Sequence, residues 1–335
     1  MQEVLGKWKR WFTRRVTPSS IFMMRLFLYL LRKLLYALSV IVGATFLVFV
    51  IFNILVGDPT LILLGKYATP EAMAVLAHEL GLDRAWYLQY WEVLKSAFTF
   101  NFGYSWTTKQ YILKTFQAGG LVSLTVTLPA FLIGNGLVIS VALWMTQYRG
   151  TIWDRLLVIF CIVMTSISLL VYILVGQLFF ACKLRIFPIM GYKEGFLACI
   201  PYIILPTIIL VLLHFCYHYR FYRTIMLEEV YQDYVRTARA KGLQEKVVLF
   251  KHIFKNVMVP IITTFVKDVP TFLFGSVVIE NFFGIPGLGS VVVDAISLCD
   301  FPTIKAVTIV AAVLSVLCNI VGDVLYTLVD PRIKL

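Results

Sequence analysis

Residues 220–260 read RFYRTIMLEEVYQDYVRTARAKGLQEKVVLFKHIFKNVMVP, and this charged stretch lies between two strongly apolar runs. Apolar residues recur in it at steps of three or four, which is typical of helices. The two rows are Met226, Val230 and Tyr234, and then Val247, Phe250, Phe254 and Val257. Gly242 separates the rows, and glycine ends a helix at low steric cost. The stretch therefore predicts a helix–Gly–helix elbow.

The elbow is basic, and its charges are arranged on helix faces. It carries eight Lys and Arg residues between positions 220 and 255. Arg236 and Arg239 are three residues apart, and Lys251 and Lys255 are four apart, so each pair shares a helix face. Two interpretations follow from this pattern. The elbow is either a basic cytoplasmic loop that only sets membrane topology, or a polar element at the membrane surface that binds another protein.

Composition indicates a protein that crosses the membrane several times. Of the 335 residues, 60% are hydrophobic and 14% are charged, and the mean hydropathy is +0.86. Such values are typical of polytopic membrane proteins. The formal net charge of +12 does not indicate a nucleic-acid partner, because Lys and Arg cluster at the ends of apolar runs, as the positive-inside rule expects. The six cysteines have no metal-binding spacing and are interpreted as free thiols.

The N-terminal part of the chain divides into three segments. Residues 1–33 form a basic cytoplasmic extension, expected to be either an amphipathic surface helix or a disordered tail. Residues 34–56 are the first transmembrane helix. Residues 57–115 form an extracytoplasmic insert, in which Thr69-Pro70-Glu71 begins a helix that ends at Gly81. A second helix, from about Asp83 to Phe98, carries Trp and Tyr residues suited to the membrane interface.

Residues 116–335 are expected to form the main transmembrane domain, with the cytoplasmic loop 220–256 inside it. The further spans are predicted at 116–148, 156–182, 195–219, 257–279 and 306–329. Residues 282–289 carry Gly and Pro and interrupt the helical pattern after the fifth span. The prediction is an all-α protein with six transmembrane helices. Both termini and the elbow then lie on the cytoplasmic side, in agreement with the distribution of Lys and Arg.

No catalytic motif is found in the sequence. It contains no G-x-x-x-x-G-K-[ST] phosphate loop, no G-x-S-x-G and no H-E-x-x-H. Lys267 and Asp268 interrupt the fifth span and are costly in lipid, so they are expected to face protein or water, either lining a polar passage between the helices or making structural pairs. His214 and His218 are four residues apart. We interpret them as a packed pair near the membrane surface rather than as half of a metal site.

The segment DYVRTARAKGL at 233–243, followed by His252, Asn256 and Pro260, resembles the "EAA" loop of ABC-importer permeases. It is most similar to the version in the oligopeptide/dipeptide/nickel family, where RTARAKG is common. Arg236 and Thr237 depart from the general consensus, which has Glu and Ala there. The motifs GDP at 57–59, NFGYSW at 101–106, ENFFGIPGLG at 280–289 and LVDPR at 328–332 also resemble this family. The resemblance runs from about residue 30 to the end.

The resemblance implies a first, or "B-type", permease subunit with the type I ABC-importer fold in a bacterial inner membrane. It implies a second related permease, two ABC ATPase subunits that bind ATP and magnesium, and an extracytoplasmic substrate-binding protein as partners. No cofactor is expected in this chain itself. The residues implied to couple to the ATPase are Tyr231, Asp233, Tyr234, Val235, Arg236, Thr237, Ala238, Arg239, Ala240, Lys241, Gly242 and Leu243.

The competing class is a secondary transporter or channel subunit that works without an ATPase. That class predicts inverted repeats or repeated intramembrane charges. The sequence contains no internal repeat, and Lys267 and Asp268 are its main candidates for such charges. Permeases of the resembling family serve dipeptides, oligopeptides, nickel chelates and other peptide-like cargo. Much of that selection is made by the binding protein, so the substrate class is expected to be peptides or peptide-like solutes.

Overall fold

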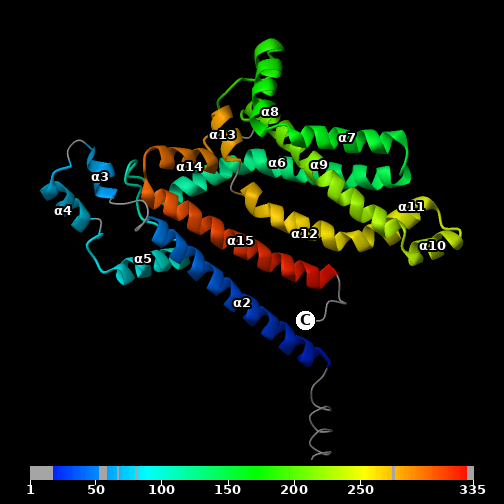
Figure 1. Cartoon of the computed structure of the whole chain (residues 1–335), viewed down its shortest axis with the longest axis horizontal. Coiled ribbons are helices and arrows are strands. Elements are labelled where there is room, and N and C mark those ends of the chain that lie inside the picture. The colour runs from blue at the N-terminus through cyan, green and yellow to red at the C-terminus, as the bar shows by residue number, and fades with distance from the viewer. Residues whose placement is uncertain are drawn as a thin grey trace, which may run out of the picture.

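In the computed structural model, every regular element of the described chain is a helix (Figure 1). The structure describes residues 18–52, 59–65, 68–79, 81–195, 197–273 and 276–329. Of residues 18–30 and 323–329 it describes the backbone only. The surface helix or tail predicted within residues 1–33 lies largely outside this range.

Five described helices are long and apolar enough to cross a membrane, or up to seven if each of two bent helix pairs is one span. The long helices are α2 (Pro18–Val50), α6 (Ile112–Gln147), α9 (Ile200–Val230), α12 (Phe254–Leu273) and α15 (Phe301–Val329). Two short elements, α11 (Glu245–Val247) and η4 (Val248–Ile253), lead directly into α12. The all-α, polytopic prediction is confirmed, and six spans falls within the range of five to seven.

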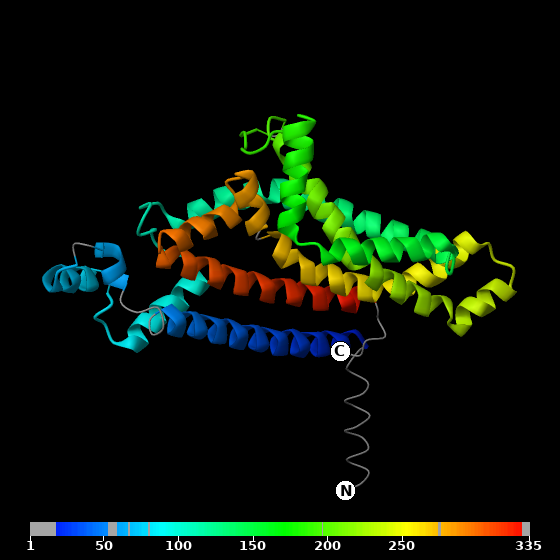
Figure 2. The same ribbon diagram turned by 45° about the horizontal axis from the view of Figure 1, so that its top comes forward.

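The long helices lie roughly side by side, and the insert and α10 occupy their opposite ends (Figures 1 and 2). Helix α6 packs along α9, α12 packs on α15, and α15 packs on α2. The insert helices α3 (Pro59–Leu64), α4 (Pro70–Glu79) and α5 (Trp86–Thr99) gather at one end. Helix α10 (Asp233–Ala240) lies at the other end. The beginning of α2 and the end of α15 lie together, away from the insert.

The insert follows its sequence prediction closely. Helix α4 begins at Pro70, and the Thr69 hydroxyl accepts a hydrogen bond from the Ala72 N–H at 3.3 Å, as an N-cap does. Gly81 adopts a positive φ of 68° just beyond that helix. Helix α5 carries the exposed rings of Trp86, Tyr87 and Trp91. Helix α2, by contrast, begins at Pro18 rather than at Leu34.

The predicted third span at 156–182 is wrong as a single straight helix. Helix α7 (Ile152–Ser166) is followed by α8 (Leu169–Gly176) and η3 (Gln177–Lys183), and the two halves are bent by 93°. Thr165 and Ser166 bond back to backbone carbonyls of α7, and such side chains compete with the helix ladder. The Tyr172 hydroxyl donates to the Met164 carbonyl at 2.7 Å, so the break leaves that acceptor satisfied.

The predicted limits of the later spans also need correction. Helix α9 continues to Val230 instead of ending at Tyr219, because no Gly or Pro follows Pro206 within it. Helix α12 ends at Leu273 instead of Ile279. The chain restarts as α13 (Val277–Phe283), whose N-cap is the Ser276 side chain. Helix α15 begins at Phe301 rather than at about Ala306.

The predicted interruption at 282–289 is confirmed. Helices α13 and α14 (Leu288–Ser297) are bent by 85°, and Gly284 between them has a φ of 63°. The Gly289 N–H donates to the Glu280 carboxylate at 2.7 Å. Glu280 is 1% exposed, so this corner is a buried polar junction.

We expect Gly289→Ala to destabilise this junction. A Cβ on Gly289 would lie 2.5 Å from the Val277 Cα and 2.8 Å from Glu280 Oε2, which forces a backbone shift. Overpacking of this kind costs about 1–3 kcal/mol of folding free energy. Thermal unfolding of the detergent-purified chain measures it. Gly136→Ala is the matched control, because a Cβ there meets nothing within 4 Å. Equal melting temperatures for the two variants would contradict the prediction.

Candidate functional site

Helix α10 is separated from α9 by a break that the sequence analysis did not predict. The chain turns at Tyr231 and Gln232, where Gln232 is extended with φ −67° and ψ 147°. The elbow therefore contains two breaks, one before α10 and one at Gly242. Because of the first break, Tyr234 does not continue the apolar row of α9. Met226 and Val230 are buried, whereas Tyr234 is exposed.

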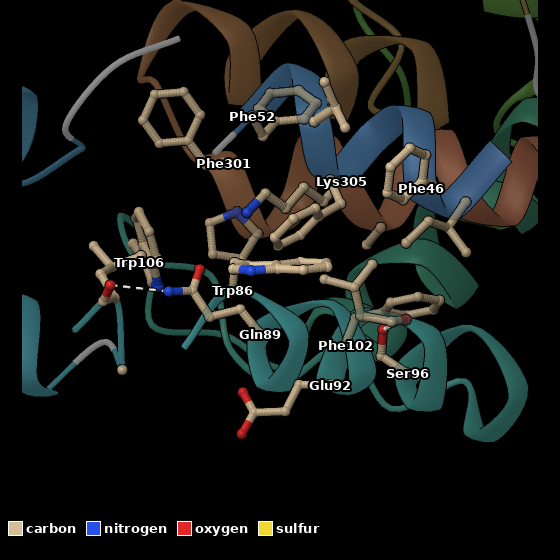
Figure 3. A pocket seen from close by; sticks show the side chains of 18 of the residues that line it. Phe46, Phe52, Trp86, Gln89, Glu92, Ser96, Phe102, Trp106, Phe301 and Lys305 are labelled. Atoms are coloured by element: carbon tan, nitrogen blue, oxygen red, sulfur yellow. Dashed lines mark hydrogen bonds between the residues drawn. The ribbon is translucent and has the colours of Figure 1, made fainter. Parts of the chain in front are cut away.

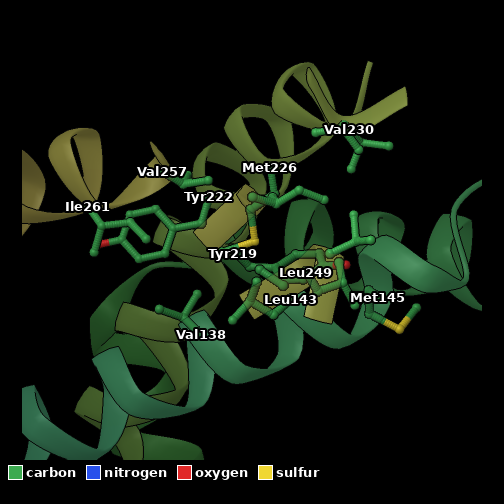
Figure 4. Packing of buried hydrophobic residues seen from close by; sticks show 14 of the residues in the cluster. Val138, Leu143, Met145, Tyr219, Tyr222, Met226, Val230, Leu249, Val257 and Ile261 are labelled. Carbon is green, nitrogen blue, oxygen red and sulfur yellow. The ribbon is translucent and has the colours of Figure 1, made fainter. Parts of the chain in front are cut away.

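Two residues anchor α10 to the largest buried cluster of the described chain. Val235 and Ala238 are 0% and 4% exposed, and both belong to a cluster that joins α6, α9, η4 and α12. Figure 4 shows side chains of α6, α9 and α12 pointing into this cluster. Helix α10 is therefore in direct packing contact with the cluster that three long helices share.

The apolar row predicted after Gly242 is wrong in register. Val247 and Phe250 are 38% and 63% exposed, and Val248 and Leu249 are buried in their place. The physical reason is the π-helical turn η4 (Val248–Ile253). A π turn holds more residues than an α turn, which rotates the following side chains relative to the α-helical pattern. The row is recovered only at Val257, which is 1% exposed.

Gly242 closes α10 in the manner expected of a glycine C-cap. Its φ is 73°, and its N–H donates to the Arg239 carbonyl at 2.9 Å. The Leu243 N–H reaches back to the Ala238 carbonyl at 3.4 Å. These two bonds form a Schellman motif, which requires a residue in the left-handed region.

An ion pair fastens the same turn from outside. Arg239 Nε and Nη2 donate to the two carboxylate oxygens of Glu245 at 3.1 and 2.6 Å. The bond to Glu245 raises the pKa of Arg239 above its usual range. Bidentate Arg–carboxylate pairs fix geometry as well as charge. Arg239 therefore fixes the path of the chain from α10 to α11.

The remaining predicted coupling residues form an exposed surface, called here the α10 face. Its members are Tyr231, Asp233, Tyr234, Arg236, Thr237, Ala240, Lys241, Gly242 and Leu243. Arg236 and Asp233 form an ion pair of 3.6 Å, but their side chains are 69% and 97% exposed. Such exposed pairs contribute little stability. These charges are therefore free to meet a partner at low cost to the fold.

The Tyr234 hydroxyl on the α10 face is a neutral hydrogen-bond donor at physiological pH. It donates to the Glu229 carboxylate at the end of α9. Burial, and then this bond, raise the pKa of Tyr234 to about 12. The bond ties the first turn of α10 to the last turn of α9 across the break.

A buried ion pair between α7 and α9 was missed by the sequence analysis. Arg223 Nε and Nη2 donate to Asp154 Oδ1 and Oδ2, both at 2.6 Å. The Asp154 side chain is 1% exposed, and its Oδ2 also accepts from the Gly150 N–H at 3.1 Å. Asp154 lies in the first turn of α7 and Arg223 lies in the part of α9 that belongs to the elbow, so the pair joins the start of α7 to the elbow. The sequence shows that both residues are charged, but it does not show that they pair with each other.

Lys267 and Asp268, predicted together as candidates for pathway lining, point to different neighbours. Lys267 is exposed and lines a cavity of about 390 Å³ with residues of α2 and α15. The Asp268 carboxylate lies 3.1 Å from His218 Nε2 of α9. The two residues therefore do not form a joint site.

A larger cavity of about 960 Å³ lies between the insert, the C-terminal end of α2 and the N-terminal end of α15. Figure 3 shows the rings of Phe46, Phe52, Trp86 and Trp106 around it, with Lys305 reaching in from α15. Beside it, buried Asp300 accepts from the Ser105 hydroxyl at 2.6 Å and from the Trp106 N–H at 3.0 Å. These bonds fasten the end of the insert to the start of α15.

The sequence matches the family described as "Binding-protein-dependent transport system inner membrane component" over residues 138–335. The corresponding N-terminal family matches residues 23–125. The chain belongs to this family. It is thus the permease subunit of a binding-protein-dependent ABC importer, a transport subunit whose ATP is hydrolysed by partner subunits. The sequence prediction of a multi-pass ABC permease of the B type is confirmed.

Curated relatives align with the permease along nearly their whole length. A "Probable peptide ABC transporter permease protein" from Sinorhizobium fredii is 32% identical, covering 91% of this chain and 99% of the relative. A "Dipeptide transport system permease protein" from Alkalihalophilus pseudofirmus is 30% identical, over 91% and 99%. A "Glutathione transport system permease protein" from Salmonella choleraesuis is also 30% identical, over 91% and 98%.

Proposed function

We propose that this permease carries peptides or peptide-like solutes and forms half of their translocation pathway. The names of its relatives support this substrate class, since they include transporters of dipeptides and of glutathione. The other half of the pathway is a second, related permease. Both permeases lie in a bacterial inner membrane, with both termini in the cytoplasm. The beginning of α2 and the end of α15 lie together, on the side away from the insert, which supports the placement of both termini on one side of the membrane.

The α10 face is the proposed docking surface for an ABC ATPase subunit. The observation that carries this assignment is the division of α10 into a buried side and an exposed charged side. Val235 and Ala238 hold the helix on the core, while Arg236 and Asp233 point outward. Closure of the ATPase dimer on ATP binding moves α10, and the packed cluster passes the motion to α9 and α12. The spans then alternate between outward and inward access.

The insert is the proposed docking region for the substrate-binding protein. It lies at the opposite end of the long helices from α10 (Figure 1). The exposed aromatic rings of α5 suit the membrane interface. The hydrogen bonds of Asp300 make the insert rigid relative to α15. A binding protein seated there therefore contacts a surface that is mechanically joined to the transmembrane helices.

Mass spectrometry of the complex co-purified from its native membrane in mild detergent tests this proposal. We expect two ATPase subunits and a second permease of the same family. A homo-oligomer without any ATPase would overturn the proposal and favour the secondary-transporter class.

Arg236→Glu tests the α10 face itself. We expect the affinity for the ATPase subunits to fall by more than about tenfold, because like-charge contacts at an interface cost several kcal/mol. Recovery of ATPase on the immobilised permease measures this affinity. Lys95→Glu, an exposed residue of α5 in the insert, makes the same charge change at the opposite end and is the control. Unchanged recovery with Arg236→Glu would remove this residue from the docking surface.

A further inference from the structure

Three metal-ligating side chains meet between α9 and α12. His214, His218 and Asp268 each offer a ligand atom, and these atoms all lie within 4.8 Å of one another. The shortest separation, 3.1 Å, is between His218 Nε2 and Asp268 Oδ2. The sequence showed the two histidines as a pair on α9. It could not show that Asp268, fifty positions later, completes a group of three.

The hydrogen bonding of this group is incomplete. His214 is 8% exposed, and its Nε2 atom is buried and without a hydrogen-bond partner. Asp268 Oδ2 is also buried, and the His218 Nε2 atom lies 3.1 Å from it. Buried polar atoms in proteins nearly always have partners, so the unpartnered His214 Nε2 beside the His218–Asp268 pair points to a site that accepts a ligand.

The surroundings hold these side chains in place. The two imidazole rings lie with their centroids 4.2 Å apart, and the rings of Phe131 and Phe272 flank His214. Gly134 of α6 leaves the space that His214 occupies, since a Cβ there would lie 2.8 Å from the His214 ring. The Asp268 side chain remains 23% exposed, which gives an ion a route in.

We propose that His214, His218 and Asp268 bind one divalent transition-metal ion of the Zn²⁺ type. Imidazole and carboxylate are ligands for such ions, at metal–ligand distances of about 2.0–2.2 Å. In tetrahedral geometry the ligand atoms then lie roughly 3.3–3.5 Å apart. The 3.1 Å contact is slightly shorter than this spacing, and the other ligand atoms lie within 4.8 Å, so binding requires only small side-chain adjustments. Three protein ligands leave a fourth position open for water.

The bound ion joins the two helices that flank the proposed coupling segment. His214 and His218 lie on α9, which leads into α10, and Asp268 lies on α12, which follows it. A metal ion bridging them fixes the distance between α9 and α12 at this level. On the proposed coupling mechanism, the ion is therefore expected to limit how far these helices separate.

Cobalt binding to the full chain tests the site. The permease is purified with a tag that contains no histidine, stripped with a chelator and titrated with Co²⁺ and then Zn²⁺. We expect one tightly bound ion per chain. The Co²⁺ complex should show visible absorption bands as intense as those of four-coordinate cobalt, and it should lack the charge-transfer band of a thiolate ligand. Zn²⁺ should displace the bound Co²⁺. The melting temperature should rise with metal concentration, because the ion binds only the folded state. Wild-type chain that binds no stoichiometric Co²⁺ overturns the proposal.

Matched variants assign the ligands. His218→Gln and Asp268→Ala should each weaken Co²⁺ binding by more than about tenfold, since even second-shell changes have effects of that size. His78→Gln and His252→Gln alter the other two histidines of the chain and should bind as wild type does. The double variant Cys161→Ser/Cys216→Ser tests whether these two thiols bind the ion instead, and it should bind Co²⁺ as the wild type does. Equal affinity in the ligand variants, or loss in the cysteine variant, overturns the assignment.

Discussion

Gly242→Pro is expected to abolish ATP-driven uptake while leaving capture of substrate by the binding protein intact. Proline holds φ near −65°, whereas Gly242 needs 73°. The substitution also removes the N–H that donates to the Arg239 carbonyl. A strain of about 3 kcal/mol or more corresponds to at least a roughly hundredfold loss of the native turn. The α10 face is then presented in the wrong orientation to the ATPase.

Uptake of a labelled peptide by the complete importer in proteoliposomes measures the effect, together with ATP hydrolysis stimulated by the loaded binding protein. Gly242→Asn is the matched control, because asparagine tolerates the left-handed region and keeps its N–H. It should retain most of the activity. Normal uptake by Gly242→Pro at wild-type membrane levels would refute the coupling role of this turn.

Arg223→Ala is expected to cause a large loss of folding stability. It leaves the Asp154 carboxylate, which is 1% exposed, without its bidentate partner. Breaking a buried pair from one side costs about 3–5 kcal/mol. The melting temperature of the purified chain and its yield in the membrane should both fall. Arg223→Lys keeps the positive charge but cannot donate two parallel hydrogen bonds to the carboxylate, so its loss of stability should be intermediate.

The double variant Asp154→Asn/Arg223→Gln tests whether the charge itself is responsible. It removes both charges and keeps hydrogen-bonding groups, so it should recover much of the stability lost in Arg223→Ala. Arg220→Ala, an exposed residue one turn earlier on α9, should melt as the wild type does. If Arg220→Ala and Arg223→Ala are equally destabilised, the ion pair is not the cause.

The sequence predicted what depends on local chemistry and short-range pattern. The apolar composition, the cap at Thr69 and the turn at Gly242 all act through neighbouring residues, and the structure agrees with each of them. The break between α7 and α8 was missed because an apolar run reads the same whether it is straight or bent. The π turn η4 was missed because it changes the helical period that the prediction assumed.

The sequence analysis also failed to predict pairs of residues that lie far apart in the chain. Asp154 with Arg223, and His218 with Asp268, are separated by long stretches of chain, and spacing carries no information about them. The division of the coupling segment into anchor and exposed residues has the same origin. Val235 and Ala238 are buried in a cluster to which η4 and residues distant in the sequence contribute. Their coupling role, with that of the exposed residues, remains a prediction.

The unbroken course of α9 has a mechanical consequence. Its 31 residues run as one α-helix from Ile200 to Val230, and two residues separate it from the start of α10. At about 1.5 Å per residue, it is a lever roughly 45 Å long. A tilt of about 5° imposed at the α10 end displaces the far end by about 4 Å, more than the width of a water molecule. In the proposed coupling mechanism, a small tilt of α9 is therefore enough to open or close a water-sized passage at its far end.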